Sequence, residues 1–337
     1  MHRRNKISRN ARTGPGSAPA ARVQVRNVGC RIAVLATISC FGLVAQRFSY
    51  CAAGGSENRP VLRVDSNLVL VPVTVTDARG AVVPDLKSTD FLLTEDKHAQ
   101  QIISFSHETA PVSLGLVVDL SGSMSNKIDK LESAVESIAA NLEDDDETFV
   151  ISFADRPTLR LPFTSDPSAI LRALALSDPC GSTSLFDAIA LAVRQMHDAH
   201  NRRRTLFVIS DGGDNHSRAS EREIRRMLDE ADIQIQAIGI HDHVSGMPAT
   251  TEEARGPWIL DDLAKMTGGQ HHMIQDAGEL PILASEISHA LHDRYLLGYK
   301  PDPAGPSGSF RRIEVKLAKP KDSRRLYVYA RRGYRMP

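Results

Sequence analysis

Two kinds of apolar pattern alternate along the middle of the chain. Runs of consecutive apolar residues predict strands at residues 113–120, 148–153, 159–163, 205–210, 233–240 and 270–274. Uninterrupted apolar runs are typical of strands buried on both faces, and strands that alternate with helices favour a mostly parallel sheet covered by helices on both sides. The pattern therefore predicts a doubly wound α/β domain.

Between these strands, apolar residues recur every three or four positions, which is the spacing of one helix face. This spacing predicts helices at residues 127–142, 185–196, 221–230, 258–267 and 279–294. The helix at 221–230 also has a start signal, because Ser220 followed by Glu223 forms a capping box in which each side chain bonds the other's backbone amide.

Short alternating strands flank this domain on both sides. They are expected at residues 68–76, 82–83, 91–93 and 101–105 before it, and at 295–299, 312–317 and 325–330 after it. Neither flank is large enough to bury an apolar face alone. We therefore expect residues 61–110 and 295–337 to pair into one small antiparallel β-sandwich, with the α/β domain, residues 111–294, inserted between them. Two separate appendages are the alternative.

The N-terminal region has the pattern of an export signal. Basic residues precede an apolar run at 32–45, which is short for a transmembrane helix but suits the core of a signal peptide. We predict that residues 1–53 are a signal peptide or N-terminal anchor and that 54–60 are a linker. The alternatives are an uncleaved anchor and lipid attachment at Cys51. The protein is thus expected in the periplasm, at the cell surface or outside the cell, with or without membrane attachment through this segment.

Charge and cysteine content change this picture in two ways. The net charge of zero divides into eight basic residues before position 32 and a remainder of net charge −8, so the body of the protein is acidic. Basic residues in the C-terminal segment alternate with apolar ones as on the solvent face of strands, and we expect no nucleic-acid partner. Three of the four cysteines lie in the predicted leader. Cys180 would be the remaining thiol, expected as a small packed residue.

Three predicted loops carry oxygen-bearing side chains that suit a hard cation. Asp119, Ser121 and Ser123 follow the first apolar strand, Thr183 precedes a helix, and Asp211 follows the strand at 205–210. Ligands of open α/β sheets collect outside the carboxyl ends of the strands, so these loops can face one point. Magnesium prefers oxygen ligands in octahedral geometry and retains waters. We predict a Mg²⁺ site, at which Mn²⁺ or Ca²⁺ would also fit.

Three sequence motifs occur in this order: LVVDLSGSM, GSTSLFDAI and VISDGGDN. Because of these motifs, residues 112–294 resemble the von Willebrand factor A domain and its metal-ion-dependent adhesion site. The resemblance implies that Ser121, Ser123 and Thr183 coordinate the cation directly, while Asp119 and Asp211 act largely through water. It also implies that an open coordination position receives an exposed Asp or Glu of a partner protein. The expected rim of the site consists of Gly122, Met124, Ser182, Gly212 and Asp214.

Other chemistries have weaker sequence support. The chain lacks a G-x-S-x-G elbow, a P-loop and a G-x-G-x-x-G motif, and we expect a binding module and not an enzyme. Phosphate transfer through Asp119 is a remote alternative, and a structural subunit of an envelope assembly is another. Zinc could bind His241, His243, His271 and His272, although solvated loop residues are the preferred interpretation. The acidic run at 143–147 resembles a calcium loop only in charge, and a solvated turn is favoured.

Overall fold

The computed structural model describes residues 68–174, 179–211, 213–240, 251–301, 306, 308–318 and 325–336, without the side chains of 251–254. All of these residues belong to one compact unit, Arg63–Pro337. The predicted leader, anchor and linker lie outside the described residues, as do His241 and His243 of the zinc hypothesis. Within the described ranges, no helix combines the length and apolar character needed to cross a membrane.

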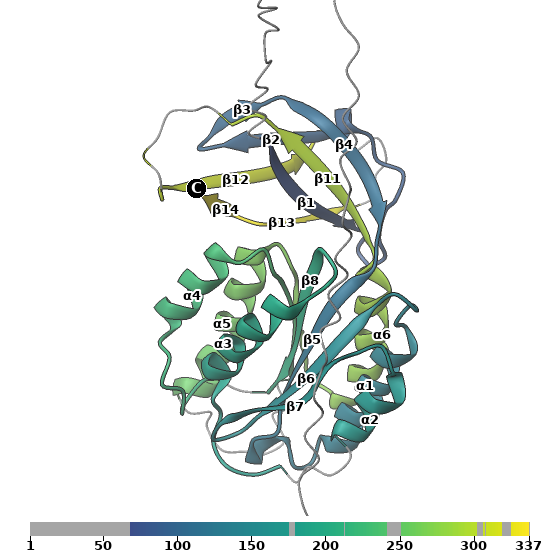
Figure 1. Cartoon of the computed structure of the whole chain (residues 1–337), viewed down its shortest axis with the longest axis vertical. Coiled ribbons are helices and arrows are strands. Elements are labelled where there is room, and N and C mark those ends of the chain that lie inside the picture. Colours follow the sequence, from purple (N-terminus) through teal and green to yellow (C-terminus); the bar gives the residue numbers. More distant parts are fainter. Residues whose placement is uncertain are drawn as a thin grey trace, which may run out of the picture. The chain divides into compact units, whose positions relative to one another are not determined.

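The central sheet has six strands in the order β10-β9-β8-β5-β6-β7 (Figure 1). Five of them run parallel, and β7 pairs antiparallel with β6 at the edge. The strands are β5 (Val112–Asp119), β6 (Glu147–Phe153), β7 (Pro157–Thr164), β8 (Arg203–Ser210), β9 (Gln234–Ile240) and β10 (His271–Ile274). The predicted mostly parallel α/β sheet is therefore confirmed.

Helices cover both faces of this sheet (Figure 1). One face packs against α1 (Ile128–Ala140), α2 (Pro167–Leu174) and α6 (Leu280–Ala290). The other face packs against α3 (Leu185–Gln195), α4 (Glu221–Glu230) and α5 (Thr251–Thr267). Short 3₁₀ helices lie at η1 (Ser88–Asp90), η2 (Gly122–Met124), η3 (Met196–Asp198) and η4 (Ala277–Glu279).

Strand β5 lies in the middle of the sheet, and all eight of its residues are buried. Leu116 and Val118 face the core under α1, while Val117 between them faces the core under α3. A side chain at Gly115 would place its Cβ 2.3 Å from the Phe149 ring. This packing explains the unbroken apolar run before Asp119, because alternate residues enter two different cores.

The flanking segments form two antiparallel four-stranded sheets, in the orders β13-β1-β11-β4 and β14-β12-β2-β3. The strands before the α/β domain are β1 (Val69–Thr76), β2 (Phe91–Glu95), β3 (His98–Gln100) and β4 (Ile102–Thr109). Those after it are β11 (Asp293–Tyr299), β12 (Phe310–Leu317), β13 (Tyr327–Ala330) and β14 (Gly333–Arg335). Strand β1 pairs with β11 and β13, and β2 pairs with β12. Val73, Leu93 and Tyr295 meet in their shared core, so the fold class includes the expected small β-sandwich.

Several predicted boundaries are wrong. Helix α6 ends at Ala290, and residues 293–294, predicted as helical, begin β11 because they pair with Thr109 and Glu108 of β4. Helix α5 begins at Thr251, seven positions before the predicted start, and contains Pro257. Helix α2 and strand β14 have no counterpart in the prediction, and Val82 forms an isolated bridge with Thr76 instead of a strand.

The acidic run at 143–147 is not a fully solvated turn. Asp146 is buried and accepts hydrogen bonds from the backbone amides of Val112 (2.7 Å) and Glu143 (2.8 Å). Its other contact is with the ring of His292, at 2.7 Å, and this hydrogen bond raises the pKa of His292. The carboxylate therefore fastens the start of β5 to the chain that follows α6.

Candidate metal centre

The carboxyl ends of β5 and β8 hold the first of the predicted site residues. Asp119, the last residue of β5, is completely buried. One of its carboxylate oxygens accepts a hydrogen bond from the Ser121 amide at 2.8 Å, and the other accepts one from the Ser210 hydroxyl at 2.5 Å. Asp119 thereby joins two adjacent strands, which agrees with the expectation that these loops meet at one edge of the sheet.

A continuous series of oxygens extends from this point toward the surface. The hydroxyl oxygens of Ser121 and Ser123 lie 3.2 Å apart, and the Ser123 hydroxyl donates to Oδ1 of Asp211 at 2.8 Å. Ser121 is buried, whereas Ser123 is exposed. The structure therefore brings Asp119, Ser121, Ser123 and Asp211 together, with the exposed end at Ser123.

Thr183 lies in a loop that is tied to the Asp119 loop by backbone hydrogen bonds. The Gly122 amide donates to the Gly181 carbonyl at 3.0 Å, and the Cys180 amide donates to the Leu120 carbonyl at 2.9 Å. Asn215 fixes Thr183 from the other side, because its side-chain oxygen accepts from the Thr183 amide at 2.8 Å. The Thr183 loop thus lies against the Asp119 loop, with the buried Thr183 held at a fixed place.

Asp155 fixes the turn that precedes Thr183, a role that the sequence did not reveal. Its carboxylate accepts a hydrogen bond from the Ser182 amide at 2.7 Å, which holds the pKa of Asp155 below its usual range. Gly181 has a φ of +83°, and a Cβ there would meet the same carboxylate at 2.7 Å. Only glycine fits both conditions without strain.

Lys127 is the second residue at the site that sequence reasoning missed. Its ammonium group contacts Oδ2 of Asp211 at 2.5 Å and donates to the Ser123 carbonyl at 2.9 Å. The side chains of Lys127 and Asp211 are only 8% and 4% exposed, so this is a buried ion pair. One oxygen of Asp211 therefore faces a serine hydroxyl, while the other is held by a fixed positive charge.

The two carboxylates create a local excess of negative charge. Burial and, after it, the charge of Asp211 raise the pKa of Asp119 to about 6. Hydrogen bonds from Ser121 and Ser210 oppose this rise but do not cancel it. A nearby cation would stabilise the charged form of Asp119, which burial and Asp211 disfavour.

The donor set fits a divalent cation. Adjacent ligands of an octahedral Mg²⁺ with bonds of about 2.1 Å lie about 3 Å apart. The separation of 3.2 Å between Ser121 Oγ and Ser123 Oγ matches this value. Asp211 Oδ1 accepts a hydrogen bond from the Ser123 hydroxyl at 2.8 Å and can orient it toward a cation. Among the described residues no cluster of three His, Cys, Asp or Glu side chains could hold a metal, so a cation here would depend on the hydroxyls.

Of the five predicted rim residues, Met124 lies elsewhere than expected. Met124 is completely buried and packs in the core against α1, so it cannot line the rim. Asp214 accepts a hydrogen bond from the Phe186 amide at 3.2 Å and another from the Ser217 hydroxyl, and thus supports the start of α3. Gly122 is exposed and Ser182 is partly exposed, as a rim requires, while Gly212 lies outside the described residues.

Two further expectations were wrong. Cys180 is an exposed free thiol and not a packed residue. His271 and His272 lie in strand β10 and are not solvated loop residues, and their Nε2 atoms are buried without a hydrogen-bond partner. Burial lowers the pKa of His271 to about 4. With His241 and His243 outside the described residues, the zinc hypothesis stays untested.

Comparison with known proteins identifies the domain. Residues 114–213 match the family model of the von Willebrand factor type A domain. A search of curated proteins finds no match. Among solved structures, a conserved hypothetical protein BatB from Bacteroides thetaiotaomicron is 20% identical, with a TM-score of 0.42, and the match covers 53% of this chain and 98% of that one.

Two other solved structures are similar at lower identity. A von Willebrand factor type A protein from Catenulispora acidiphila is 12% identical, with 80% of this chain and 74% of that chain covered and a TM-score of 0.47. Proximal thread matrix protein 1 from the mussel byssus, solved with a zinc-occupied MIDAS motif, is 16% identical, with 58% and 49% covered and a TM-score of 0.47. From this family match, which covers residues 114–213, the α/β part of the chain contains a von Willebrand factor type A domain.

Proposed function

We propose that this protein is a metal-dependent protein-binding module that holds Mg²⁺ at Ser121, Ser123 and Thr183 and engages an exposed carboxylate of a partner protein. The observation that carries the proposal is the gathering of Asp119, the two serine hydroxyls and Asp211 at one place. The Ser121 amide bonds Asp119, the two hydroxyls lie 3.2 Å apart, and the Ser123 hydroxyl bonds Asp211. The cation would supply the positive charge that the partner's carboxylate recognises.

The chain's own residues prepare this site before a cation arrives. Asp119 holds the Ser121 amide and Ser210, which fixes the path of the loop that carries both serines. Lys127 neutralises one oxygen of Asp211, so the site presents less negative charge than two free carboxylates would. The direct ligands are then neutral hydroxyls, and most of the cation's charge stays available to an incoming carboxylate.

The exposed end of the series indicates where a partner would approach. Ser123 and Gly122 are exposed, whereas Ser121, Thr183 and Asp119 are buried. A carboxylate from another protein would therefore reach the cation from the Ser123 side. The amino-terminal basic and apolar segment supports export, so we propose that this partner lies in the cell envelope or outside the cell.

The proposal predicts that partner capture requires a divalent cation. The full chain, immobilised in Mg²⁺ and exposed to envelope extract of the encoding organism, should retain a protein that chelator releases. Asp119→Ala should retain none of it. Asp144→Ala is the matched control, because Asp144 is an exposed carboxylate in the turn before β6, at the opposite end of the sheet from Asp119.

Retention of the same protein in chelator and by Asp119→Ala would contradict the proposal. The alternative of a structural assembly subunit predicts a different result. In that case chelator would reduce the molecular mass of an assembly of this chain, as measured by light scattering, without releasing another protein.

A further inference from the structure

A small cavity lies where the amino-terminal ends of β8 and β9 meet the β-sandwich. Its volume is about 40 Å³, room for about three water molecules. It is lined by residues of β8, β9, α4 and α5, by the turn between α4 and β9, and by residues of β1, β11 and β14 and the residue after β13. Five of the lining residues are arginines: Arg202, Arg203, Arg204, Arg294 and Arg331.

The carboxylates at this cavity do not balance its arginines. Asp229 and Asp232 also line it. Asp229 pairs at 3.4 Å with Arg335, which is not one of the five, and Asp232 pairs at 3.3 Å with Arg331. Glu108, which does not line the cavity, lies 3.9 Å from Arg294. Within the described part of the chain, the guanidinium of Arg204 has neither an ion pair nor a hydrogen bond. The lining therefore carries excess positive charge.

Arg203 shows how strongly this charge is buried. Arg203 is only 4% exposed. Its terminal nitrogens donate to the backbone carbonyls of Leu291 (2.8 Å) and Glu108 (3.2 Å), and these acceptors carry no charge. Burial and the charge of Arg294 lower the pKa of Arg203 to about 10. A buried guanidinium without a carboxylate partner is costly, since its desolvation is not compensated.

The Nε atoms at the cavity are also unsatisfied. Those of Arg203, Arg204, Arg294 and Arg331 are all buried without a hydrogen-bond partner. Buried polar atoms in native proteins almost always have a partner, and a charged donor left alone is the most costly case. Four such donors on the lining of one cavity indicate a shared acceptor.

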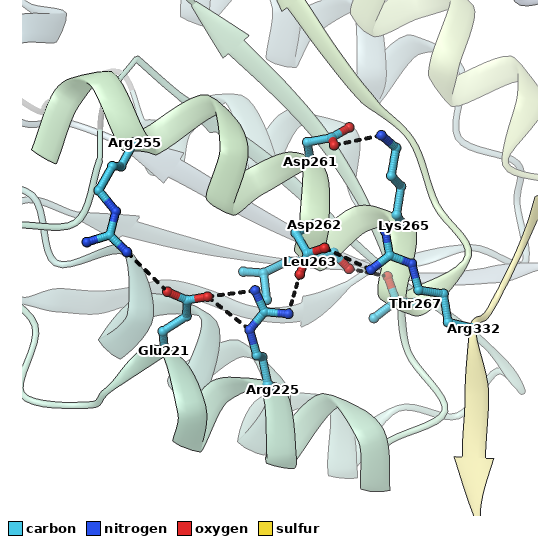
Figure 2. A network of polar contacts seen from close by, with 9 residues as sticks. All are labelled: Glu221, Arg225, Arg255, Asp261, Asp262, Leu263, Lys265, Thr267 and Arg332. Carbon is cyan, nitrogen blue, oxygen red and sulfur yellow. Dashed lines mark hydrogen bonds and ion pairs between the residues drawn. The ribbon is translucent and has the colours of Figure 1, made fainter. Parts of the chain in front are cut away.

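A nearby network shows the opposite arrangement (Figure 2). There Arg225 contacts both Glu221 and Asp262, and Arg332 donates to Asp262 at 2.8 Å. Both arginines thus contact a carboxylate, and they share Asp262. At the cavity, Arg294 and Arg331 also have carboxylate partners, whereas Arg203 and Arg204 have none within the described part of the chain. The shortage of acceptors therefore concerns Arg203 and Arg204 and is not a general property of the surface between α4, α5 and the C-terminal strands.

We propose that this cavity is a binding site for a small oxyanion of the phosphate class. Guanidinium groups donate paired N–H groups in a planar fork that matches the oxygens of phosphate. Arg203 and Arg204 belong to the α/β domain, whereas Arg294 and Arg331 belong to strands of the sandwich or follow them directly. A bound oxyanion would therefore link the two parts of the fold.

This site is separate from the proposed metal centre. Arg203 begins β8 and Ser210 ends it, and a strand of that length spans about 20 Å. The oxyanion site thus lies at the opposite edge of the sheet and does not depend on the proposed metal-dependent function. Chelator and Asp119→Ala should leave oxyanion binding unchanged, so failure of one proposal would not imply failure of the other.

The test is calorimetric titration of the full chain with inorganic phosphate in chelator, with sodium chloride of equal ionic strength as the reference. We expect saturable phosphate binding and a higher thermal unfolding midpoint in phosphate than in chloride. Arg204→Gln should weaken phosphate binding by about tenfold or more, because one charge-assisted donor pair is lost. Arg226→Gln is the matched control, since Arg226 is 76% exposed on α4 and does not line the cavity.

Arg204→Lys retains the charge without the fork and should bind phosphate with intermediate affinity, and it serves as the second variant if Arg204→Gln does not fold. Titration with vesicles of phosphatidylglycerol, with and without phosphate as competitor, distinguishes a lipid headgroup from the free anion. The proposal is overturned if phosphate gives no saturable heat beyond chloride, or if Arg204→Gln and Arg226→Gln bind phosphate equally.

Discussion

Replacing Lys127 with methionine should lower the free energy of unfolding of the metal-free protein by about 3 kcal/mol, and it should also tighten Mg²⁺ binding by about tenfold or more. The first effect follows because Asp211 would keep a buried charge without its partner, whereas its side chain is now 4% exposed and paired at 2.5 Å. Removal of one member of a buried ion pair is strongly destabilising for this reason.

The second effect follows because Lys127 competes with a cation for the same carboxylate. Even in water, neighbouring unit charges repel by about 1 kcal/mol, and Mg²⁺ carries two. Urea denaturation in chelator and in Mg²⁺ measures both effects, since saturating Mg²⁺ should restore much of the lost stability. Lys265→Met is the control, because its pair with Asp261 is surface-exposed, and it should change stability by less than about 1 kcal/mol. Loss of stability together with weaker Mg²⁺ binding would refute the assigned role of Lys127.

In chelator, the contribution of Asp119 to the free energy of unfolding should decrease by about 3 kcal/mol as the pH rises from about 4 to above 6. The folded-state pKa of Asp119 is about 6, above its usual value of 3.8. Between these values the folded protein binds the proton that the unfolded chain has lost. The stability that Asp119 contributes is therefore highest below about pH 4 and falls as the pH rises. A carboxylate in an ion pair usually shows the opposite dependence.

Mg²⁺ should reverse this dependence, because the cation favours the charged carboxylate. Its affinity should increase about tenfold per pH unit up to about pH 6 and then level off. Urea denaturation of the wild type and of Asp119→Asn across this pH range isolates the effect, since all other titrating groups are common to both. If the difference between the two proteins is independent of pH, Asp119 does not titrate as described.

The sequence predicted the parts of the site that depend on strand ends. Asp119 and Asp211 follow buried apolar runs, and parallel strands in one sheet end at the same edge, so the two loops had to lie close. The sandwich was equally predictable, because each of the two flanking segments of short strands lacks a partner for its apolar face.

Long-range polar contacts were not predictable in this way. Lys127 and Asp211 are 84 positions apart, and Asp155 and Ser182 are 27 apart. Nothing in the local pattern distinguishes these residues from exposed charges. Met124 was expected at the rim, but in the 3₁₀ turn at Gly122–Met124 its side chain lies in the core.

The prediction of helix ends failed for a related reason. Residues 293 and 294 continue an amphipathic pattern, yet pairing with β4 makes them a strand. Such pairing between distant segments overrides local preference. The five arginines at the oxyanion cavity likewise come from three separate segments, which only the folded chain brings together.

The central claim is that the oxygens around Asp119 and Ser123 bind a divalent cation. Isothermal titration of the full chain with Mg²⁺, and then with Mn²⁺ and Ca²⁺, tests it most directly when repeated on Asp119→Ala. We predict saturable binding to a single site in the wild type and an affinity about 10- to 100-fold lower in the variant. Equal binding by the two proteins, or no binding by either, would contradict the claim.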